Sequence, residues 1–175
     1  MKDVRRTLAS FLLLIAGIVR SGTADAQVRT SEYEAEKLRL AKAASEAEMT
    51  LLEGLELAEP FGRPVSGSFR NEGGSVRLII YVKKGESVYR VQPRHRGKKP
   101  QVAEVTDPHE YSDAYADAAA MVHATKSLRQ AVQESLQGDV SLVATAVVPR
   151  SSGRHSSAEV TIFDGRVVKR VAVPL

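Results

Sequence analysis

Three side chains in this sequence have the types and the spacing of a metal site. His109, Asp113 and Asp117 recur at every fourth position. On a helix they would share one face, and imidazole and carboxylate groups are common ligands of divalent metals. Acidic residues near the start of a helix also stabilise it by complementing the helix dipole. We favour this second explanation and expect an exposed face with no bound metal.

No other pattern in the sequence indicates catalysis. The chain has no cysteine and therefore no thiol nucleophile or thiolate metal ligand. No serine stands in a G-x-S-x-G or S-x-x-K pattern, and Gly73-Gly74 is not followed by the Lys-Ser/Thr of a phosphate-binding loop. The remaining histidines, His95, His123 and His155, lie in polar segments or near a helix end. We expect a non-enzymatic protein without a cofactor, and a hydrolase in the second half is the less favoured alternative.

Residues 1–26 have the pattern of a secretory signal peptide. Arg5 and Arg6 precede an apolar run, and Ala24 and Ala26 supply the small residues that a signal peptidase requires. The apolar run is shorter than the roughly 20 residues of a membrane-spanning helix, which argues against a membrane anchor. We predict cleavage after Ala26, a periplasmic or secreted protein, and no stable membrane insertion after cleavage.

Capping motifs and hydrophobic periodicity predict the elements of the mature chain. Thr50 and Glu53 form a capping box, Ser31 begins an earlier helix, and Asp107-Pro108 has a cap residue followed by proline at the first helical position. The predicted helices cover residues 31–48, 50–60 and 108–123, and a fourth runs from a cap at Thr125 or Ser127 to Gly138. The predicted strands cover residues 65–70, 76–82, 87–92, 101–105, 140–148, 158–163 and 166–173.

One strand-turn-strand pattern occurs twice. Its turns are marked by Gly85 and by Gly165. From here on, two residues are called corresponding when they are as many sequence positions apart as these two glycines. The preceding helices align Gly62 with Gly138, a separation that is shorter by four positions. We assign the four additional positions to the loop 149–156, because insertions in loops cost little stability. The repetition predicts an internal duplication.

The predicted fold is therefore α+β, with helices packed on an antiparallel sheet. It consists of two tandem helix-helix-three-strand units, over residues 27–105 and 106–175. The predicted core contains Leu52, Leu55, Leu78, Ile80, Val82, Val91, Leu128, Val132, Val160, Ile162 and Val171.

Residues 50–105 resemble the PepSY domain family. The resemblance lies in a capped helix that ends at Gly62, the meander that follows, and Val-Tyr-Arg-Val91 before Gly97-Lys98. Pro93 stands where the family tends to place aspartate. Residues 125–175 resemble a second copy that ends before the turn of the terminal motif. The resemblance implies an exported, non-enzymatic domain with a proposed role in restraining peptidases, and it transfers no catalytic residue.

Charge is distributed unevenly along the chain. Residues 83–99 contain seven Lys/Arg and one Glu, whereas residues 32–59 contain eight Glu and three Lys/Arg. Basic residues on edge strands also prevent unwanted strand pairing, so the basic segment by itself does not define a site. The alternative is a basic face that contacts an acidic protein, lipopolysaccharide or anionic lipid. Nucleic acid is not an expected partner of an exported protein with few aromatic residues.

The outward faces of two predicted strands suggest where a partner would bind. Alternate residues of a strand share a face, so Tyr81 and Phe163 should point away from the core. An edge strand could also accept an extended peptide, with nearby basic side chains steering an acidic partner. The predicted partner-binding residues are Tyr81, Phe163, Arg94, Arg96, Lys98 and Lys99.

These features predict an exported binding or regulatory module that restrains a peptidase or senses an envelope partner. The alternative function is a structural envelope protein that binds anionic surface components.

Overall fold

The computed structural model describes residues 21–94, 98–153 and 155–175, with side chains described from residue 33. The chain divides into two compact units, residues 1–37 and 38–175. The first contains most of α2 (Ser21–Ser45), with an ion pair of 3.6 Å between Lys37 and Glu34. The sequence predicts a helix that begins at Ser31, which is wrong: no proline or glycine interrupts 24–45, and the helix is already formed at Ser21.

The predicted signal peptide lies outside the described residues except for 21–26, which belong to α2. Among the helices of the described residues, none is long and apolar enough to span a membrane.

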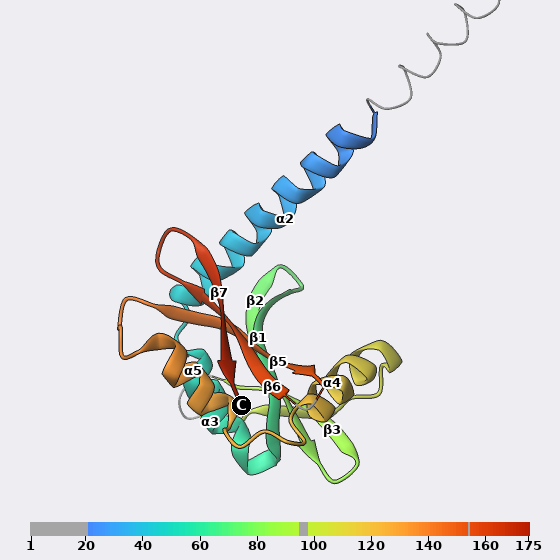
Figure 1. The fold of residues 1–175 in the computed structure, drawn as a ribbon. Coiled ribbons are helices and arrows are strands. Elements are labelled where there is room, and N and C mark those ends of the chain that lie inside the picture. The colour runs from blue at the N-terminus through green and yellow to red at the C-terminus, as the bar shows by residue number, and fades with distance from the viewer. Residues whose placement is uncertain (1–20, 95–97, 154) are drawn as a thin grey trace, which may run out of the picture. The chain divides into compact units, whose positions relative to one another are not determined.

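The second unit contains the end of α2 and all of the remaining elements (Figure 1). Its elements are α3 (Leu51–Ala58), the 3-10 helix η1 (Glu59–Phe61), β1 (Arg63–Glu72), β2 (Ser75–Lys84), β3 (Ser87–Gln92), β4 (Gln101–Glu104), α4 (Pro108–Ala120), α5 (Leu128–Leu136), β5 (Val143–Ser152), β6 (His155–Phe163) and β7 (Val168–Pro174). Among the described residues, seven strands form one sheet in the order β4-β3-β2-β1-β5-β6-β7, and all neighbours are antiparallel. The predicted α+β class with an antiparallel sheet is confirmed.

The short helices α3 and α5 begin with the same local chemistry. The Thr50 hydroxyl accepts a hydrogen bond from the Glu53 N–H at 3.2 Å, and the Glu53 carboxylate accepts one from the Thr50 N–H at 2.8 Å. Ser127 and Gln130 repeat this reciprocal arrangement at 3.1 and 2.8 Å. Capping boxes satisfy backbone donors that a helix start otherwise leaves unpaired. The Thr50 box and a cap at Ser127 are both confirmed.

The two meanders, β1–β3 and β5–β7, have the same strand register. Every residue pair of the β1–β2 hairpin, from Arg63 opposite Lys83 to Glu72 opposite Ser75, recurs between the corresponding residues of the β5–β6 hairpin. The irregularity that follows Pro64 recurs after the corresponding residue, Ala144. The pairs that join β2 to β3 from Ile80 to Lys83 recur in β6 and β7.

This register corrects the position of the additional residues. The hairpins are equally long, so the prediction that four residues are inserted in 149–156 is wrong. Gly62 leads directly into β1, whereas residues 139–142 separate Gly138 from β5. The additional residues therefore lie between α5 and β5, in a turn where the Leu142 N–H donates to the Asp139 carbonyl at 3.2 Å.

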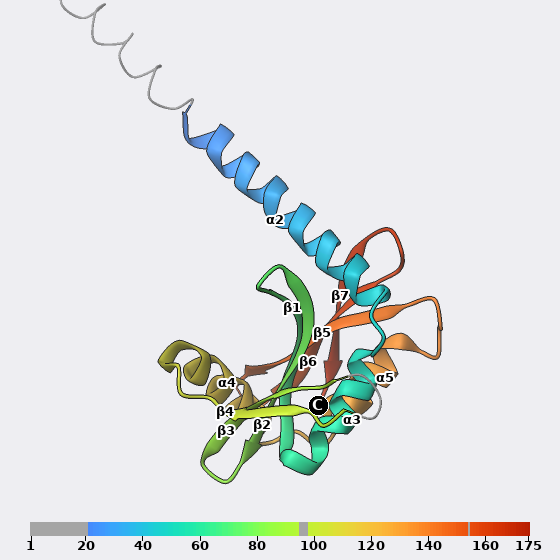
Figure 2. The ribbon, with the colours of Figure 1, turned by 180° about the vertical axis from the view of Figure 1, so that it is seen from behind.

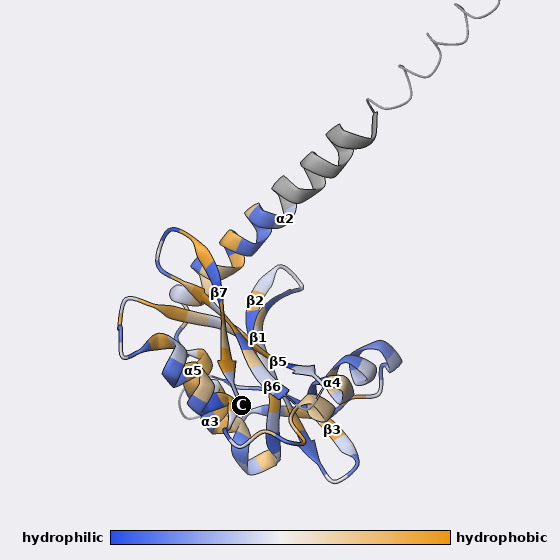
Figure 3. Cartoon of the chain, viewed as in Figure 1, coloured by the Kyte–Doolittle hydropathy of each residue, from blue (hydrophilic) through white to orange (hydrophobic). Residues whose placement is uncertain are grey.

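The main hydrophobic core lies between the sheet and the helix pair α3 and α5, which lie side by side (Figure 1). Apolar segments of these helices and of the strands appear in orange in Figure 3. The predicted core residues on α3, α5, β2 and β6 are buried, except Leu52, which is partly buried. Gly67 lies at this interface because a Cβ atom there would stand 2.6 Å from Ile80 Cδ1.

The sequence predicts that Val171 is buried because it corresponds to Val91, and this prediction is wrong. Val91 is 0% exposed, whereas Val171 is 37% exposed. The cause is the neighbouring strand: Val91 pairs with Val102 of β4 on its outer side, and among the described residues no strand lies beyond β7.

Helix α4 covers the face of the sheet opposite to α3 and α5. Ala114 and Ala118, one helical turn apart, pack on a second apolar cluster. That cluster also contains Val65, Ile79, Tyr81, Val88 and Val105. Small side chains at this spacing let a helix approach a sheet closely. Helix α4 contacts β1, β3 and β5, and Figure 2 shows it from behind.

Candidate binding site beneath helix α4

Helix α4 is fixed at its start by Asp107. One carboxylate oxygen of Asp107 accepts hydrogen bonds from the His109 and Glu110 N–H groups, at 3.0 and 2.9 Å. Pro108 occupies the first helical position, where its missing N–H costs nothing. With the alanines of α4 against the sheet, the spacing of Glu110, Asp113 and Asp117 places all three carboxylates along one side of the same helix.

The sheet places polar residues opposite these carboxylates. Ser66 of β1 and Arg90 of β3 both pair with Tyr81 of β2. Directly opposite residues of antiparallel strands present their side chains on the same face. Alternate residues of one strand also share a face, so Ser68 and Arg70 follow Ser66 on this side.

These side chains form one hydrogen-bonded network. Arg70 Nε donates to Ser68 Oγ at 3.0 Å and its Nη1 donates to the Tyr81 hydroxyl at 3.1 Å. The guanidinium carbon of Arg70 lies 5.2 Å from the centre of the Tyr81 ring. The Tyr81 hydroxyl in turn donates to the Glu110 carboxylate, and Glu110 lies 4.0 Å from Arg90 Nε. Arg70 and Arg90 thus hold the tyrosine and Glu110 in place from two strands.

The environment of Tyr81 keeps its hydroxyl protonated. Burial, followed by the hydrogen bond to Glu110, raises the pKa of Tyr81 well above its usual range. The hydroxyl therefore donates to Glu110 and accepts a hydrogen bond from Arg70.

A cavity of about 270 Å³ lies beside this network. Its lining residues are Arg70, Tyr81, Glu110, Asp113, Ala114 and Asp117. Burial raises the pKa of Asp117. The Ser66 hydroxyl and the positive charges of Arg150 and Arg70 lower this pKa and so partly offset the rise. A carboxyl group with a shifted pKa in a cavity is a recognised mark of a functional site.

A second hollow of about 180 Å³ continues the polar surface toward β4. Its lining residues are Glu72, Arg77, Arg90, Gln92, Gln101 and Ala103. The Arg90 guanidinium donates to Glu72 of this hollow and also lies beside Glu110 of the cavity, so Arg90 links the two polar groups of residues.

The three residues considered as metal ligands do not come together as a site. Asp113 and Asp117 line the cavity with Glu110, whereas His109 is exposed and does not line it. Within the described residues there is no group of three or more His, Cys, Asp or Glu side chains that could hold a metal ion. His123 and His155 are exposed, and His95 lies outside the described residues.

The two predicted aromatic contact residues are buried. Tyr81 is 3% exposed beneath α4, and Phe163 is 5% exposed on β6, paired on its two sides with Val143 and Val168. The expectation of an open aromatic contact face is therefore wrong for both. Tyr81 belongs to the apolar cluster beneath α4, on the face opposite to α3 and α5.

The predicted basic residues lie on the connection between β3 and β4. Arg94, Lys98 and Lys99 are exposed, and Arg94 Nη2 donates to the Gln101 side chain at 2.8 Å. Arg96 lies outside the described residues.

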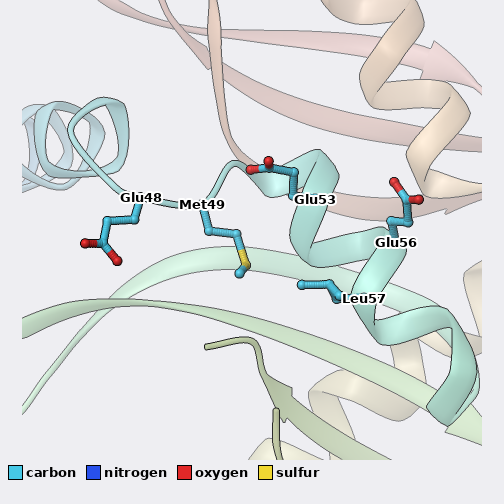
Figure 4. Close-up of a pocket in the computed structure, with 5 residues that line it drawn as sticks. All are labelled: Glu48, Met49, Glu53, Glu56 and Leu57. Atoms are coloured by element: carbon cyan, nitrogen blue, oxygen red, sulfur yellow. The ribbon is translucent and has the colours of Figure 1, made fainter. Parts of the chain in front are cut away.

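A further hollow, of about 220 Å³, lies at the start of α3. Met49 and Leu57 extend toward one another there, with Glu48, Glu53 and Glu56 around them (Figure 4). Glu53 belongs to the capping box of α3, so at least one of these carboxylates has a structural role.

No protein-family model, curated protein or solved structure matches this chain. The site must therefore be judged from its own geometry. Sequence reasoning misses Ser66, Arg70, Arg90 and Glu110. Strand alternation places the two arginines on the Tyr81 face, and the helical spacing of Glu110 with Asp113 and Asp117 is visible in the sequence. The missing information is that α4 lies over this face.

Proposed function

We propose that this protein is an exported, non-enzymatic binding or regulatory module made of two PepSY-like halves. In this proposal it takes an extended segment of a protein partner as an additional strand beside β7. A partner such as an exported peptidase would be restrained by this pairing. The tandem organisation is supported by the strand register that recurs between the two meanders.

The observation that carries the proposal is the difference between two corresponding edges. The outer side of β3 pairs with a short extended segment, β4, from Tyr89 opposite Glu104 to Gln92 opposite Gln101. The corresponding residues of β7 are Lys169 to Ala172, and all four are exposed. The first meander thus already accepts a strand at the position that β7 leaves open among the described residues.

The backbone of β7 is oriented for such pairing. The Leu175 N–H donates to the Ser156 carbonyl at 3.0 Å, so the backbone of Leu175 faces β6. Successive residues of an antiparallel strand direct their backbone groups to opposite sides. Arg170 and Ala172 therefore direct their N–H and C=O groups outward, where an incoming strand would bond to them.

A proline at one outward position tests this mode of binding. Ala172→Pro removes an outward N–H without removing a bond to β6, and proline is tolerated on edge strands. Ala172→Val is the matched control, because it adds bulk but keeps the N–H. Both variants and the unchanged chain would be used to capture partners from periplasmic extract. We expect the same partner with the unchanged chain and Ala172→Val, and at least about a tenfold loss with Ala172→Pro. Equal capture by all three would contradict the proposal.

Export forms part of the proposal and has its own test. The mature protein should begin at Gln27 and appear in the periplasmic or extracellular fraction. An intact Met1 in the membrane fraction would place the protein in the anchored class instead.

The exposed basic side chains on the β3–β4 connection favour a second candidate function, binding of anionic envelope components. Reversing the charges of Arg94, Arg96, Lys98 and Lys99 should then abolish binding to vesicles that contain anionic lipid. Binding should also weaken between low and physiological salt, because the Debye length falls from about 30 Å to about 8 Å. Vesicle binding that is insensitive to both changes would exclude this candidate.

A further inference from the structure

We propose that the protein segment that pairs with β7 is acidic: it carries a β-branched apolar residue opposite Val171 and, directly after it, a carboxylate opposite Arg170. The inference rests on the proposed function and names the chemistry of its partner. It is drawn from the pairing of β3 with β4, which shows what the corresponding edge of the first meander accepts.

The pairing of β3 with β4 shows which kind of residue should face Val171. Val102 of β4 stands opposite Val91, which is fully buried, whereas the corresponding Val171 is partly exposed. The outward backbone groups of β7 belong to Arg170 and Ala172, so Val171 would form a non-hydrogen-bonded pair with its new neighbour. Side chains are closest at such pairs. A β-branched apolar residue there would cover Val171 as Val102 covers Val91.

Strand β7 presents positive charge to an incoming strand. Between Val168 and Pro174 it contains Lys169 and Arg170 and no acidic residue. Both basic side chains are exposed. Lys169 is already paired with Asp164, at 2.8 Å, in the turn before the strand. Arg170 is therefore the side chain whose charge a partner strand can complement.

Arg170 has fewer carboxylates around it than the corresponding residue of the first meander, Arg90. The Arg90 guanidinium donates to Glu72 and also lies 4.0 Å from Glu110. Among the described residues, Arg170 has one ion pair, with Glu159 at 3.6 Å. The same type of side chain thus has two carboxylates in the first meander and one in the second.

The single carboxylate beside Arg170 is also shared. Glu159 lies 4.0 Å from Arg150 of β5 as well. Arg150 in turn acts on Asp117 of α4, whereas Arg170 has no second carboxylate among the described residues.

The residue opposite this arginine is where the two edges should differ. On the first edge it is Ala103, because Arg90 obtains its carboxylates from Glu72 and Glu110. Directly opposite side chains of paired strands lie within reach of each other, and opposite charges at such positions stabilise the pairing. A carboxylate opposite Arg170 would take the place of the second carboxylate that Arg90 has.

A second copy of this chain fits the β7 edge less well than an acidic segment. Two β7 strands paired with each other would bring Lys169 and Arg170 of both copies together and add no carboxylate to either strand. Like charges across paired strands are destabilising, and basic residues on edge strands commonly prevent such pairing. The same charges favour an acidic strand, so they select among partners.

A nuclear magnetic resonance titration of the full chain with short peptides tests the inference. The probe is acetyl-Thr-Thr-Ser-Val-Glu-Thr-Thr-amide, whose valine would lie opposite Val171 and whose glutamate would lie opposite Arg170. Control peptides replace the glutamate by glutamine or lysine, or the valine by serine. Shifts of the Arg170 and Ala172 amide signals report binding at the edge and give the affinity of each peptide.

We expect the glutamate peptide to bind about two- to fivefold more tightly than the glutamine peptide, because an exposed ion pair contributes little. The lysine peptide should bind more weakly still. Replacing the valine by serine should also weaken binding about two- to fivefold. Arg170→Gln should remove the difference between the glutamate and glutamine peptides. Arg166→Gln is the matched control, because it neutralises an exposed arginine between β6 and β7 and should preserve the difference.

The possible contradictions separate the inference from the proposed function. Equal affinity of the glutamate, glutamine and lysine peptides at these amides would overturn the inference and leave strand addition at β7 standing. Equal loss of discrimination in Arg166→Gln and Arg170→Gln would also overturn it, because the selection would not arise at Arg170. If no peptide shifts the Arg170 and Ala172 amides, strand addition itself is contradicted, and the inference with it. Shifts that grow with protein concentration alone would assign the edge to a second copy, against the inference.

Discussion

The two meanders of this sheet share one register and differ in what covers them. The first, β1–β3, packs beneath α4, which also contacts β5 of the second meander, and it pairs with β4 at its outer edge. The second, β5–β7, ends at β7, beyond which no strand lies among the described residues. Corresponding backbones therefore provide a covered polar cavity in one half and an open edge in the other.

Corresponding residues of the two meanders show how the type of a side chain follows from its burial. Ile79 is buried beneath α4, whereas the corresponding Glu159 is partly exposed and lies 4.0 and 3.6 Å from two arginines, Arg150 and Arg170. A carboxylate is tolerated where water and arginines solvate it, and an apolar side chain is required where a helix excludes water. The arginines themselves correspond to Arg70 and Arg90, so both halves keep two arginines on this face.

The largest expected effect is on the core that both meanders share. Ile80→Ala and Ile162→Ala should each lower the free energy of unfolding by about 2–5 kcal/mol, because each removes buried methyl groups and leaves a cavity. Chemical denaturation measures the effect. A midpoint that does not change in either variant would show that the two meanders do not share this core.

A smaller effect should distinguish the two halves at Tyr81 and the corresponding residue, Thr161. Tyr81→Phe removes the hydroxyl that links Arg70 to Glu110, and leaving partly buried polar groups unpaired should cost about 1–3 kcal/mol. The Thr161 side chain makes no hydrogen bond among the described residues, so Thr161→Val should change stability by no more than about 0.5 kcal/mol. Similar losses from both substitutions would remove this distinction.

The smallest effect is a dependence on pH that arises at Asp117 of α4. The folded-state pKa of Asp117 is raised by burial, so the stability from its protonated form is present below its unfolded pKa and lost as pH rises through the folded value. Asp117→Asn should therefore be more stable than the unchanged chain near neutral pH, and the difference should vanish in acid. The groups around Asp117 are Ser66, Arg150, Asp113 and Arg70. Denaturation midpoints across this pH range would show the trend, and a constant difference would contradict it.

Local features of the fold could be predicted from the sequence, because they depend on neighbouring residues. The Thr50 capping box, the start of α4 at Asp107-Pro108 and the bounds of β3 are confirmed. Alternation along β2 also places Ile80 and Tyr81 on opposite faces correctly.

Long-range placement could not be predicted in the same way. Periodicity shows that α4 has a small-residue face but not which side of the sheet it covers, and for that reason the prediction of an exposed Tyr81 is wrong. The prediction of a buried Val171 is wrong because the pairing of β3 with β4 depends on contacts that alternation does not specify. The residue types of the candidate site are visible in the sequence. Their proximity depends on where α4 packs, which the sequence does not show.

Amide hydrogen exchange on the full chain tests the account most directly. The Val105 N–H donates to the Val88 carbonyl at 2.9 Å, so alternate residues of β3, including Arg90 and Gln92, direct their backbone groups toward β4. We predict slow exchange at Arg90 and Gln92, fast exchange at Arg170 and Ala172 in the free chain, and slow exchange at the latter two when the captured partner is added. Equal protection of all four amides in the free chain, or no change at Arg170 and Ala172 with the partner, would contradict binding at an open β7 edge.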